Sequence, residues 1–138
     1  MKIYFSGSIR GGREQVDWYT FIVKNLTNFG DVLTEFVADK SLSSYGQADL
    51  DDKYIYQRDI DLVKASDVIV ADVTIPSLGV GYEIAYAERL GKKIYCLYHH
   101  IEGTKISAMI AGNPNINTFH YTNEEQISKI LKEIFEQK

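Results

Sequence analysis

The sequence predicts an α/β protein: a three-layer flavodoxin- or Rossmann-like fold with a five-stranded parallel sheet, in one domain over residues 1–138. Short apolar or β-branched runs alternate along the chain with longer segments in which apolar residues recur every three or four positions. One run, residues 67–73, is apolar on both pleats, as is typical of a central strand covered by helices on both faces. Five strands favour the flavodoxin-like strand order over a full dinucleotide-binding fold.

The first half of the chain carries the first two strands of this prediction. The expected order is a strand at 3–5, a helix at 14–28, a strand at 32–34, a polar irregular loop at 37–49, and a helix at 50–64. Gly7 ends the first strand, and Gly30 stands where a glycine commonly ends a helix. We expect the polar loop to be the most mobile part of the chain.

The second half continues the alternation from the central strand at 67–73. It is followed by a loop through Pro76, a helix at 79–90 that ends at Gly91, a strand at 93–98, a short helix at 106–110 and a strand at 117–121. The last helix has a predicted capping box, with Thr122 at the N-cap and Glu125 three residues later. In a sheet of this kind, ligands bind at the carboxyl ends of the strands, where the strand order reverses.

Composition excludes several classes of protein. A net charge of -4 disfavours a basic surface for nucleic acid, and the apolar runs are too short to span a membrane. The single Cys96 excludes an intrachain disulfide, and the N-terminus lacks the pattern of a signal peptide. The three histidines lack metal-ligand spacing. We therefore expect a soluble cytoplasmic protein without a metal site or cofactor.

The glycine-rich segment after the first strand is the first candidate site. It comprises Gly7, Ser8, Ile9, Arg10, Gly11, Gly12 and Arg13. Glycines let backbone N–H groups approach an anion, and the next helix adds the positive end of its dipole. Arginine side chains can pair with a phosphate. The segment matches neither GxGxxG nor the Walker pattern, so a simple turn with solvated arginines is the alternative.

A second candidate site is the segment 75–83, in which Ser77, Gly79 and Gly81 precede Glu83. The serine and glycines resemble an anion cradle at a helix start. Glu83 falls in the first turn of the predicted helix, where an acidic residue can simply complement the helix dipole. The two glycines are poor helix formers, which favours close approach by a ligand.

Several carboxylates form the third candidate. Asp59 lies within a predicted helix, Asp72 ends the central strand and Glu35 follows the second strand. Two carboxylates that converge on one cleft suit glycosidic chemistry, because one stabilises or traps the anomeric carbon while the other moves protons. A solvated helix face is the alternative for Asp59.

Taken together, these segments resemble a known family. Residues 4–13, 32–35, 72–74, 76–83 and 107–110 are similar to the 2'-deoxynucleoside 5'-phosphate N-hydrolases, in the nucleoside 2-deoxyribosyltransferase superfamily. The match runs in order through almost the whole chain. The resemblance implies a glycosidase that hydrolyses the base from a 2'-deoxynucleoside 5'-monophosphate.

The resemblance also implies residue roles. Glu83 matches the glutamate that attacks the anomeric carbon and forms a glycosyl-enzyme ester, Asp59 a second catalytic aspartate near the departing base, and Tyr4 a tyrosine at the sugar. Substrate contacts are implied for the glycine-rich segment 7–13 and for Phe36, Ser77, Gly79, Ser107, Ala108 and Met109. Ser107 matches a serine that reaches the phosphate in the neighbouring subunit, which implies a homodimer.

The sequence departs from the family pattern at Phe36, where mammalian members carry a histidine, and over residues 41–52. Both departures leave the base preference open. Three alternatives also remain: a nucleoside 2-deoxyribosyltransferase, a ribonucleotide N-glycosidase of the CMP type, and a non-catalytic nucleotide sensor. Arg10, Ser77 and Ser107 favour a monophosphate substrate, and Tyr4 favours a deoxyribose.

Overall fold

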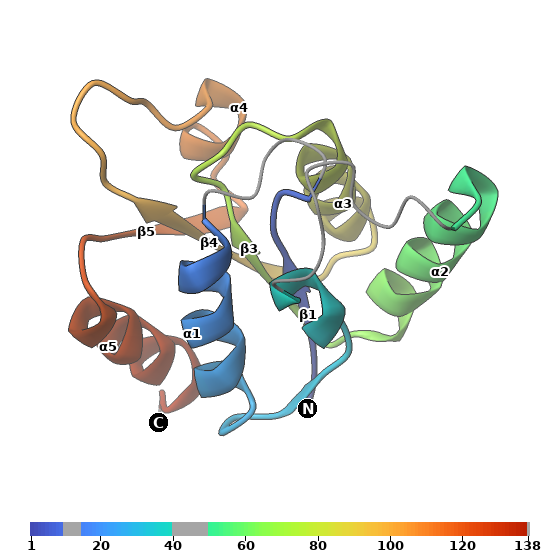
Figure 1. Ribbon diagram of the computed structural model, residues 1–138, viewed down its shortest axis with the longest axis horizontal. Helices are drawn as coiled ribbons and strands as arrows, with labels where there is room; N and C mark the ends of the chain where they lie inside the picture. The colour runs from blue at the N-terminus through green and yellow to red at the C-terminus, as the bar shows by residue number, and fades with distance from the viewer. Residues whose placement is uncertain (10–14, 40–49, 138) are drawn as a thin grey trace.

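Five parallel strands form one sheet in the order β2-β1-β3-β4-β5, as the computed structural model shows for residues 1–9, 15–39 and 50–137 (Figure 1). The strands are β1 (Lys2–Ser6), β2 (Asp31–Val32), β3 (Val68–Asp72), β4 (Lys93–His99) and β5 (Ile116–Tyr121). The strand order reverses at β1, which lies between β2 and β3. The predicted flavodoxin-like sheet is therefore confirmed, and β3 is its fully buried central strand.

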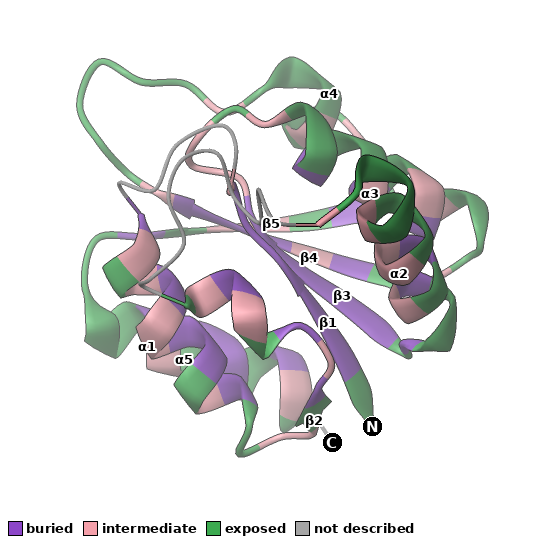
Figure 2. Cartoon of the chain, turned by 45° about the vertical axis from the view of Figure 1, so that its right-hand side comes forward, coloured by how far each residue is buried: buried purple, intermediate pink, exposed green. Residues whose placement is uncertain are grey.

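Helices cover both faces of the sheet (Figures 1 and 2). They are α1 (Val16–Leu26), the 3-10 helix η1 (Glu35–Ala38), α2 (Asp52–Ala65), α3 (Leu78–Arg89), α4 (Ala108–Ala111) and α5 (Glu124–Phe135). Helices α1 and α5 pack on one face, and α2 and α3 pack on the other. The short α4 lies near the carboxyl ends of the strands, on the opposite side of the molecule from the N-terminus (Figure 1).

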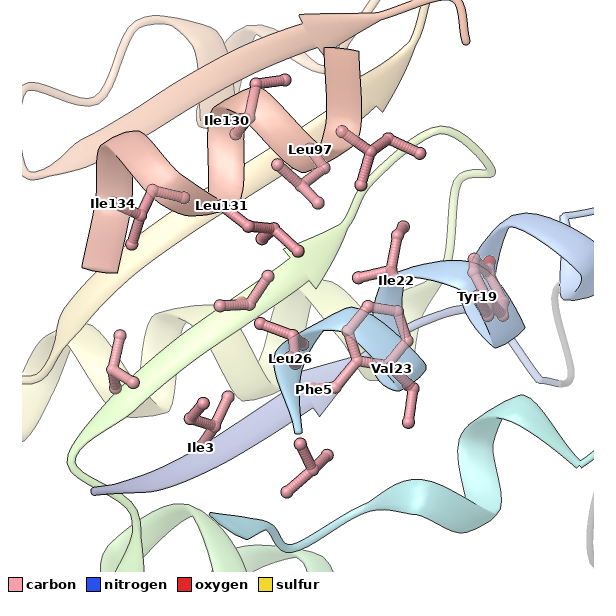
Figure 3. Close-up of a cluster of buried hydrophobic side chains, with 14 of the residues drawn as sticks. Ile3, Phe5, Tyr19, Ile22, Val23, Leu26, Leu97, Ile130, Leu131 and Ile134 are labelled. Atoms are coloured by element: carbon pink, nitrogen blue, oxygen red, sulfur yellow. The ribbon is translucent and has the colours of Figure 1, made fainter. Parts of the chain in front are cut away.

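The pleat of β1 decides which side chains reach each layer. Ile3 and Phe5 point to the α1 and α5 face, where they join the core cluster of Figure 3 with Tyr19 and Leu131. Tyr4 points to the other face, into the cluster beneath α2 and α3. Because successive strand residues alternate in direction, the tyrosine is buried among residues that lie next to the second helical layer.

The predicted strand at 32–34 is shorter in the structure, since β2 contains only two residues. The Thr34 hydroxyl accepts a hydrogen bond from Phe5 N at 2.8 Å and donates one to Phe5 O at 2.6 Å. A side chain thus replaces the backbone ladder at this position and lets the chain turn into η1. The predicted loop at 37–49 begins in η1, and its residues 40–49 lie outside the described residues.

The predicted cap of the last helix is displaced by one residue. Asn123, not Thr122, is the N-cap of α5, and its side chain accepts from Gln126 N at 2.9 Å. The Gln126 side chain in turn accepts from Thr122 N at 2.6 Å. The predicted capping box of Thr122 and Glu125 is therefore wrong: Asn123 caps the helix, and the third helical residue, Gln126, bonds the backbone of the residue before the cap instead of the cap itself.

Candidate active site

Glu83 projects from α3 toward β1. The Tyr4 hydroxyl donates a hydrogen bond to Glu83 Oε2, and the Ser6 hydroxyl contacts Glu83 Oε1 at 3.4 Å. Both donors come from the same face of β1, because they are two residues apart on a strand. Glu83 is the sixth residue of α3, beyond its first turn, so it is poorly placed to complement the helix dipole.

The protein environment favours the protonated form of Glu83. Burial of the carboxyl group raises its pKa from 4.5 to about 8. Removing a carboxylate from water disfavours its charge unless hydrogen bonds or cations compensate. When it is ionised, a carboxylate with a raised pKa is a stronger base and a stronger nucleophile than one exposed to water.

Asp59 faces the same region from α2. A pocket of about 390 Å³ lies between α2 and α3 and is lined by Asp52, Ile55, Tyr56, Asp59, Ile60, Gly79, Tyr82 and Glu83. Burial raises the pKa of Asp59, while a hydrogen bond and the charge of Arg58 act in the opposite direction. The predicted pair of carboxylates, Asp59 and Glu83, therefore shares one pocket. Such a pair can divide nucleophilic and proton-transfer roles.

Phe36 is in contact with Arg58 and is not among the residues that line this pocket. The Arg58 guanidinium carbon lies 4.1 Å from the centre of the Phe36 ring. The same guanidinium donates from Nε to Asp59 Oδ1 at 2.9 Å. Phe36 is thus connected to Asp59 through the arginine.

The glycine-rich segment is described only in part. Gly7, Ser8 and Ile9 follow β1, whereas Arg10, Gly11, Gly12 and Arg13 lie outside the described residues. A Cβ atom at Gly7 would lie 3.0 Å from two ring atoms of Tyr19, whose hydroxyl accepts from Ser8 N at 3.0 Å. Gly7 is therefore needed for the close packing of Tyr19 against the backbone.

Ser77 is the N-cap of α3 and accepts from Val80 N at 3.3 Å. Gly79, in the first turn, lines the carboxylate pocket, and a Cβ atom there would meet only Ser77 Oγ, at 3.8 Å. The protein itself does not require a glycine at position 79. The open space at this helix start is available to a ligand.

A second, largely apolar groove of about 510 Å³ separates α3 from α4. Ser77, Ser107 and Met109 are among its lining residues. Ser107 is the N-cap of α4 and accepts from Met109 N at 3.2 Å, while the Met109 side chain is exposed. Ser77 and Ser107 thus face one groove within a single chain. The neighbouring Ala108 is exposed in the first position of α4.

Asp72 belongs to a separate buried network. The Tyr121 hydroxyl donates to Asp72 Oδ2 at 2.6 Å and accepts from Gln15 Nε2 at 2.9 Å, and Gln15 Oε1 lies 3.0 Å from His99 Nδ1. The His99 ring stacks on Tyr121 and packs against Trp18, with ring centres 4.6 Å apart in the latter pair. Asp72 therefore ties strand ends to the start of α1, although the sequence suggested it as a site carboxylate.

Sequence reasoning did not identify Ser6, Asp52, Tyr56 or Tyr82. Ser6 could have been found from its position two residues after Tyr4, since both must face the same layer. Asp52 and Tyr56 precede Asp59 by seven and three positions, so the helical repeat places them near one face of α2. Tyr56 and Tyr82 form an edge-to-face pair with ring centres 6.2 Å apart.

The described ranges contain no group of three or more histidine, cysteine, aspartate or glutamate side chains that could hold a metal ion. In those ranges, no helix is both long enough and apolar enough to cross a bilayer.

Known proteins resemble this chain in sequence and in fold. A model of the nucleoside 2-deoxyribosyltransferase family matches residues 3–129. A Danio rerio protein named 5-hydroxymethyl-dUMP N-hydrolase is 48% identical over 138 residues, which cover 99% of this chain and 96% of that protein. The Mus musculus protein of the same name is 45% identical over 137 residues, covering 97% and 79%.

A solved structure, that of the Clostridium botulinum CMP N-glycosidase BcmB, superposes with a TM-score of 0.66 at 19% sequence identity. The superposition covers 96% of this chain and 99% of that one. At this identity the likeness concerns the fold, which is the same three-layer arrangement.

Proposed function

Because the chain belongs to the nucleoside 2-deoxyribosyltransferase family, we propose that it is an N-glycosidase that hydrolyses 2'-deoxynucleoside 5'-monophosphates to a free base and 2-deoxyribose 5-phosphate. The observation that carries this proposal is the convergence of Tyr4, Glu83 and Asp59 on the boundary between β1, α2 and α3. The names of the relatives in fish and mouse support the same reaction.

In the first step, ionised Glu83 attacks C1' of the sugar. The C1'–N bond breaks, its electron pair goes to the base, and Asp59 supplies the proton that makes the base a better leaving group. Tyr4 donates to the Glu83 carboxylate and holds it against the sugar. The product of this step is a glycosyl ester of Glu83.

In the second step, water attacks C1' of the ester. Asp59, now ionised, takes the proton from water, and the C1'–O bond to Glu83 breaks, which restores the carboxylate. One aspartate thus serves as acid and then as base. The two steps consume one water and require no cofactor.

The start of α3 and the glycine-rich segment 7–13 are the proposed 5'-phosphate site. Ser77 and the open surface at Gly79 support this assignment, since a helix start attracts anions. Ser107, from its own chain or from a second copy, would complete the site. We propose a homodimer in which Ala108 and Met109 lie at the interface and Ser107 reaches the neighbouring phosphate. A cytoplasmic location suits the buried free thiol of Cys96.

The decisive experiment incubates the protein with matched deoxy- and ribonucleoside monophosphates and their nucleosides, including 5-hydroxymethyl-dUMP, and follows the free base by chromatography. We expect base release from deoxynucleoside monophosphates, little from nucleosides, and none with Glu83→Gln. Transfer of the sugar to an added second base would instead indicate a transferase. Tight binding without release of base from any compound would indicate a nucleotide sensor.

A further inference from the structure

The Arg58 side chain contacts both the Phe36 ring and the carboxyl group of Asp59. On one side its guanidinium lies over the Phe36 ring, at 4.1 Å from the ring centre, and Tyr54 lies farther away at 6.0 Å. On the other side its Nε–H donates to Asp59 Oδ1 at 2.9 Å. The side chains of Arg58 and Asp59 are only 18% and 23% exposed, so this ion pair is shielded from water.

This geometry constrains Arg58 more than a typical surface arginine. An aromatic ring favours a guanidinium over its face, and the planar group then presents its N–H in a fixed direction. Phe36 is itself held in η1, where it packs against the main core cluster. The hydrogen bond to Asp59 therefore starts from an anchored donor.

We propose that Arg58, seated on Phe36, is a positioning residue that orients Asp59 for proton transfer, and that Phe36 acts through Arg58 rather than by touching the base. The inference rests on the proposed function of Asp59. With Oδ1 held by the arginine, Oδ2 is the oxygen that gives a proton to the departing base and later accepts one from water.

The charge of Arg58 also suits the double role of Asp59. Burial raises the pKa of the Asp59 carboxyl, and the hydrogen bond and charge of Arg58 lower it. Loss of the arginine would therefore shift Asp59 further toward its protonated form, which is the form that cannot take a proton from water in the second step.

Other ionisable groups face the same pocket. Asp52 and Tyr56 come from α2, and Tyr82 and Glu83 come from α3. From β1, Tyr4 contacts Glu83, and η1 carries the exposed Glu35 at its start. None of these named groups is a cation, so Arg58 is the positive charge among the groups named here. A pH profile of activity would report on Glu83 as well as on Asp59, so the test must follow the titration of Asp59 itself.

The test is an NMR titration of carboxyl-¹³C-aspartate-labelled protein, with Asp59→Asn used to assign the signal. We expect Arg58→Gln, which keeps an N–H donor and most of the volume, to move the Asp59 midpoint to higher pH. Arg58→Lys keeps the charge and is expected to leave the midpoint closer to that of the wild type. Phe36→Leu should shift the midpoint in the same direction as Arg58→Gln, but less, and should add nothing in the Arg58→Gln background.

Activity supplies the second readout. We expect Arg58→Gln to lower kcat at neutral pH by about tenfold, a part of what a general acid–base group contributes. The exposed Arg89 of α3 is the matched control, and Arg89→Ala should leave both the titration and kcat unchanged. An unchanged Asp59 midpoint in folded Arg58→Gln would overturn the proposal, as would a shift of equal size in Arg89→Ala.

Because the titration needs no substrate, it separates this inference from the proposed function. A wild-type protein that releases no base would remove the proposed reaction, while the dependence of Asp59 on Arg58 would still be measured. If Arg58→Gln fails to fold, Phe36→Leu decides the outcome, with Arg58→Lys as the variant that keeps the charge: an unchanged Asp59 midpoint in Phe36→Leu would contradict the proposal.

Discussion

The hydroxyl of Tyr4 on β1 donates a hydrogen bond to Oε2 of Glu83 on α3, across 79 positions of sequence. The contact exists because Tyr4 alternates away from Ile3 and Phe5 and so faces the layer formed by α2 and α3. It connects the strand at which the sheet order reverses with the helix that carries the proposed nucleophile.

The stability of the protein is expected to depend on the ionisation of Glu83. Burial raises its pKa from 4.5 to about 8, so between these values the folded chain holds a proton that the unfolded chain has lost. The free energy of unfolding therefore falls as pH rises through this window. Glu83→Gln has no such charge, and near pH 9 it should be more stable than the wild type by on the order of a few kcal/mol.

Urea unfolding of both proteins near pH 9 and near pH 4 measures this difference. It should nearly vanish at the lower pH, where the glutamate is protonated in both states. An equal difference at both pH values would mean that the effect does not come from the buried charge.

The pH dependence of catalysis should have the opposite sign, because the nucleophile must be ionised. We expect the ionisation of Glu83 to raise kcat/KM for base release toward about pH 8, while the loss of the proton that Asp59 gives to the base acts against this rise. Tyr4→Phe removes a donor to the carboxylate, so it should lower kcat and move the rise to higher pH. Ser6→Ala, which loses a longer contact of 3.4 Å, is the comparison and should act less. Profiles that superpose for all three proteins would argue against ionisation of Glu83 as the limiting event.

Gly79→Ala separates a ligand effect from a stability effect. The added methyl group has room in the protein, where its nearest neighbour would be Ser77 Oγ at 3.8 Å, and alanine favours a helix by up to about 1 kcal/mol over glycine. We expect an unchanged or higher Tm, with KM for the monophosphate raised several-fold. Gly81→Ala is the comparison in the same helix: it has nothing within 4 Å of the added atom, and it lines the groove shared by Ser77 and Ser107 instead of the carboxylate pocket. Equal effects of the two substitutions on KM would remove position 79 from the proposed substrate contacts.

The source of Ser107 can be tested by mixing subunits. If Ser107 completes the phosphate site of a second copy, Ser107→Ala and Glu83→Gln subunits should form heterodimers in which one site has both intact residues. Activity of the mixture should then exceed that of either parent. If Ser107 serves its own chain across the groove that it shares with Ser77, mixing restores nothing. Sedimentation of the wild type measures the oligomeric state independently.

The strand pattern and the helical repeats were sufficient to predict the sheet and its order. Local hydrogen bonds were harder to predict, because several similar polar side chains lie close enough to bond the same backbone group. Thr34 ends β2 early by bonding both backbone groups of Phe5, and Asn123 displaces Thr122 as a cap. Neither of these hydrogen bonds changes the spacing of the apolar residues, so the apolar pattern does not predict them.

The candidate site, too, was predictable from the sequence only in part. Glu83 and Asp59 were candidates from their positions, a family resemblance implied their roles, and the structure brings them to one pocket. Asp72 looked equivalent, but it pairs with Tyr121 inside the core, 49 positions later in the chain. The position of a carboxylate at a strand end does not reveal whether it faces a cleft or a buried hydroxyl.

The buried network of Asp72 and Tyr121 has a practical consequence. The only tryptophan of the protein, Trp18, packs against His99 within this network, and Gln15 of the same network comes two positions after the glycine-rich segment 7–13 in the sequence. Indole emission is sensitive to the charge and distance of an adjacent imidazole. The protein therefore carries an intrinsic optical probe that follows the proposed phosphate segment by five positions in the sequence, and we expect nucleotide binding to change its fluorescence without an attached dye.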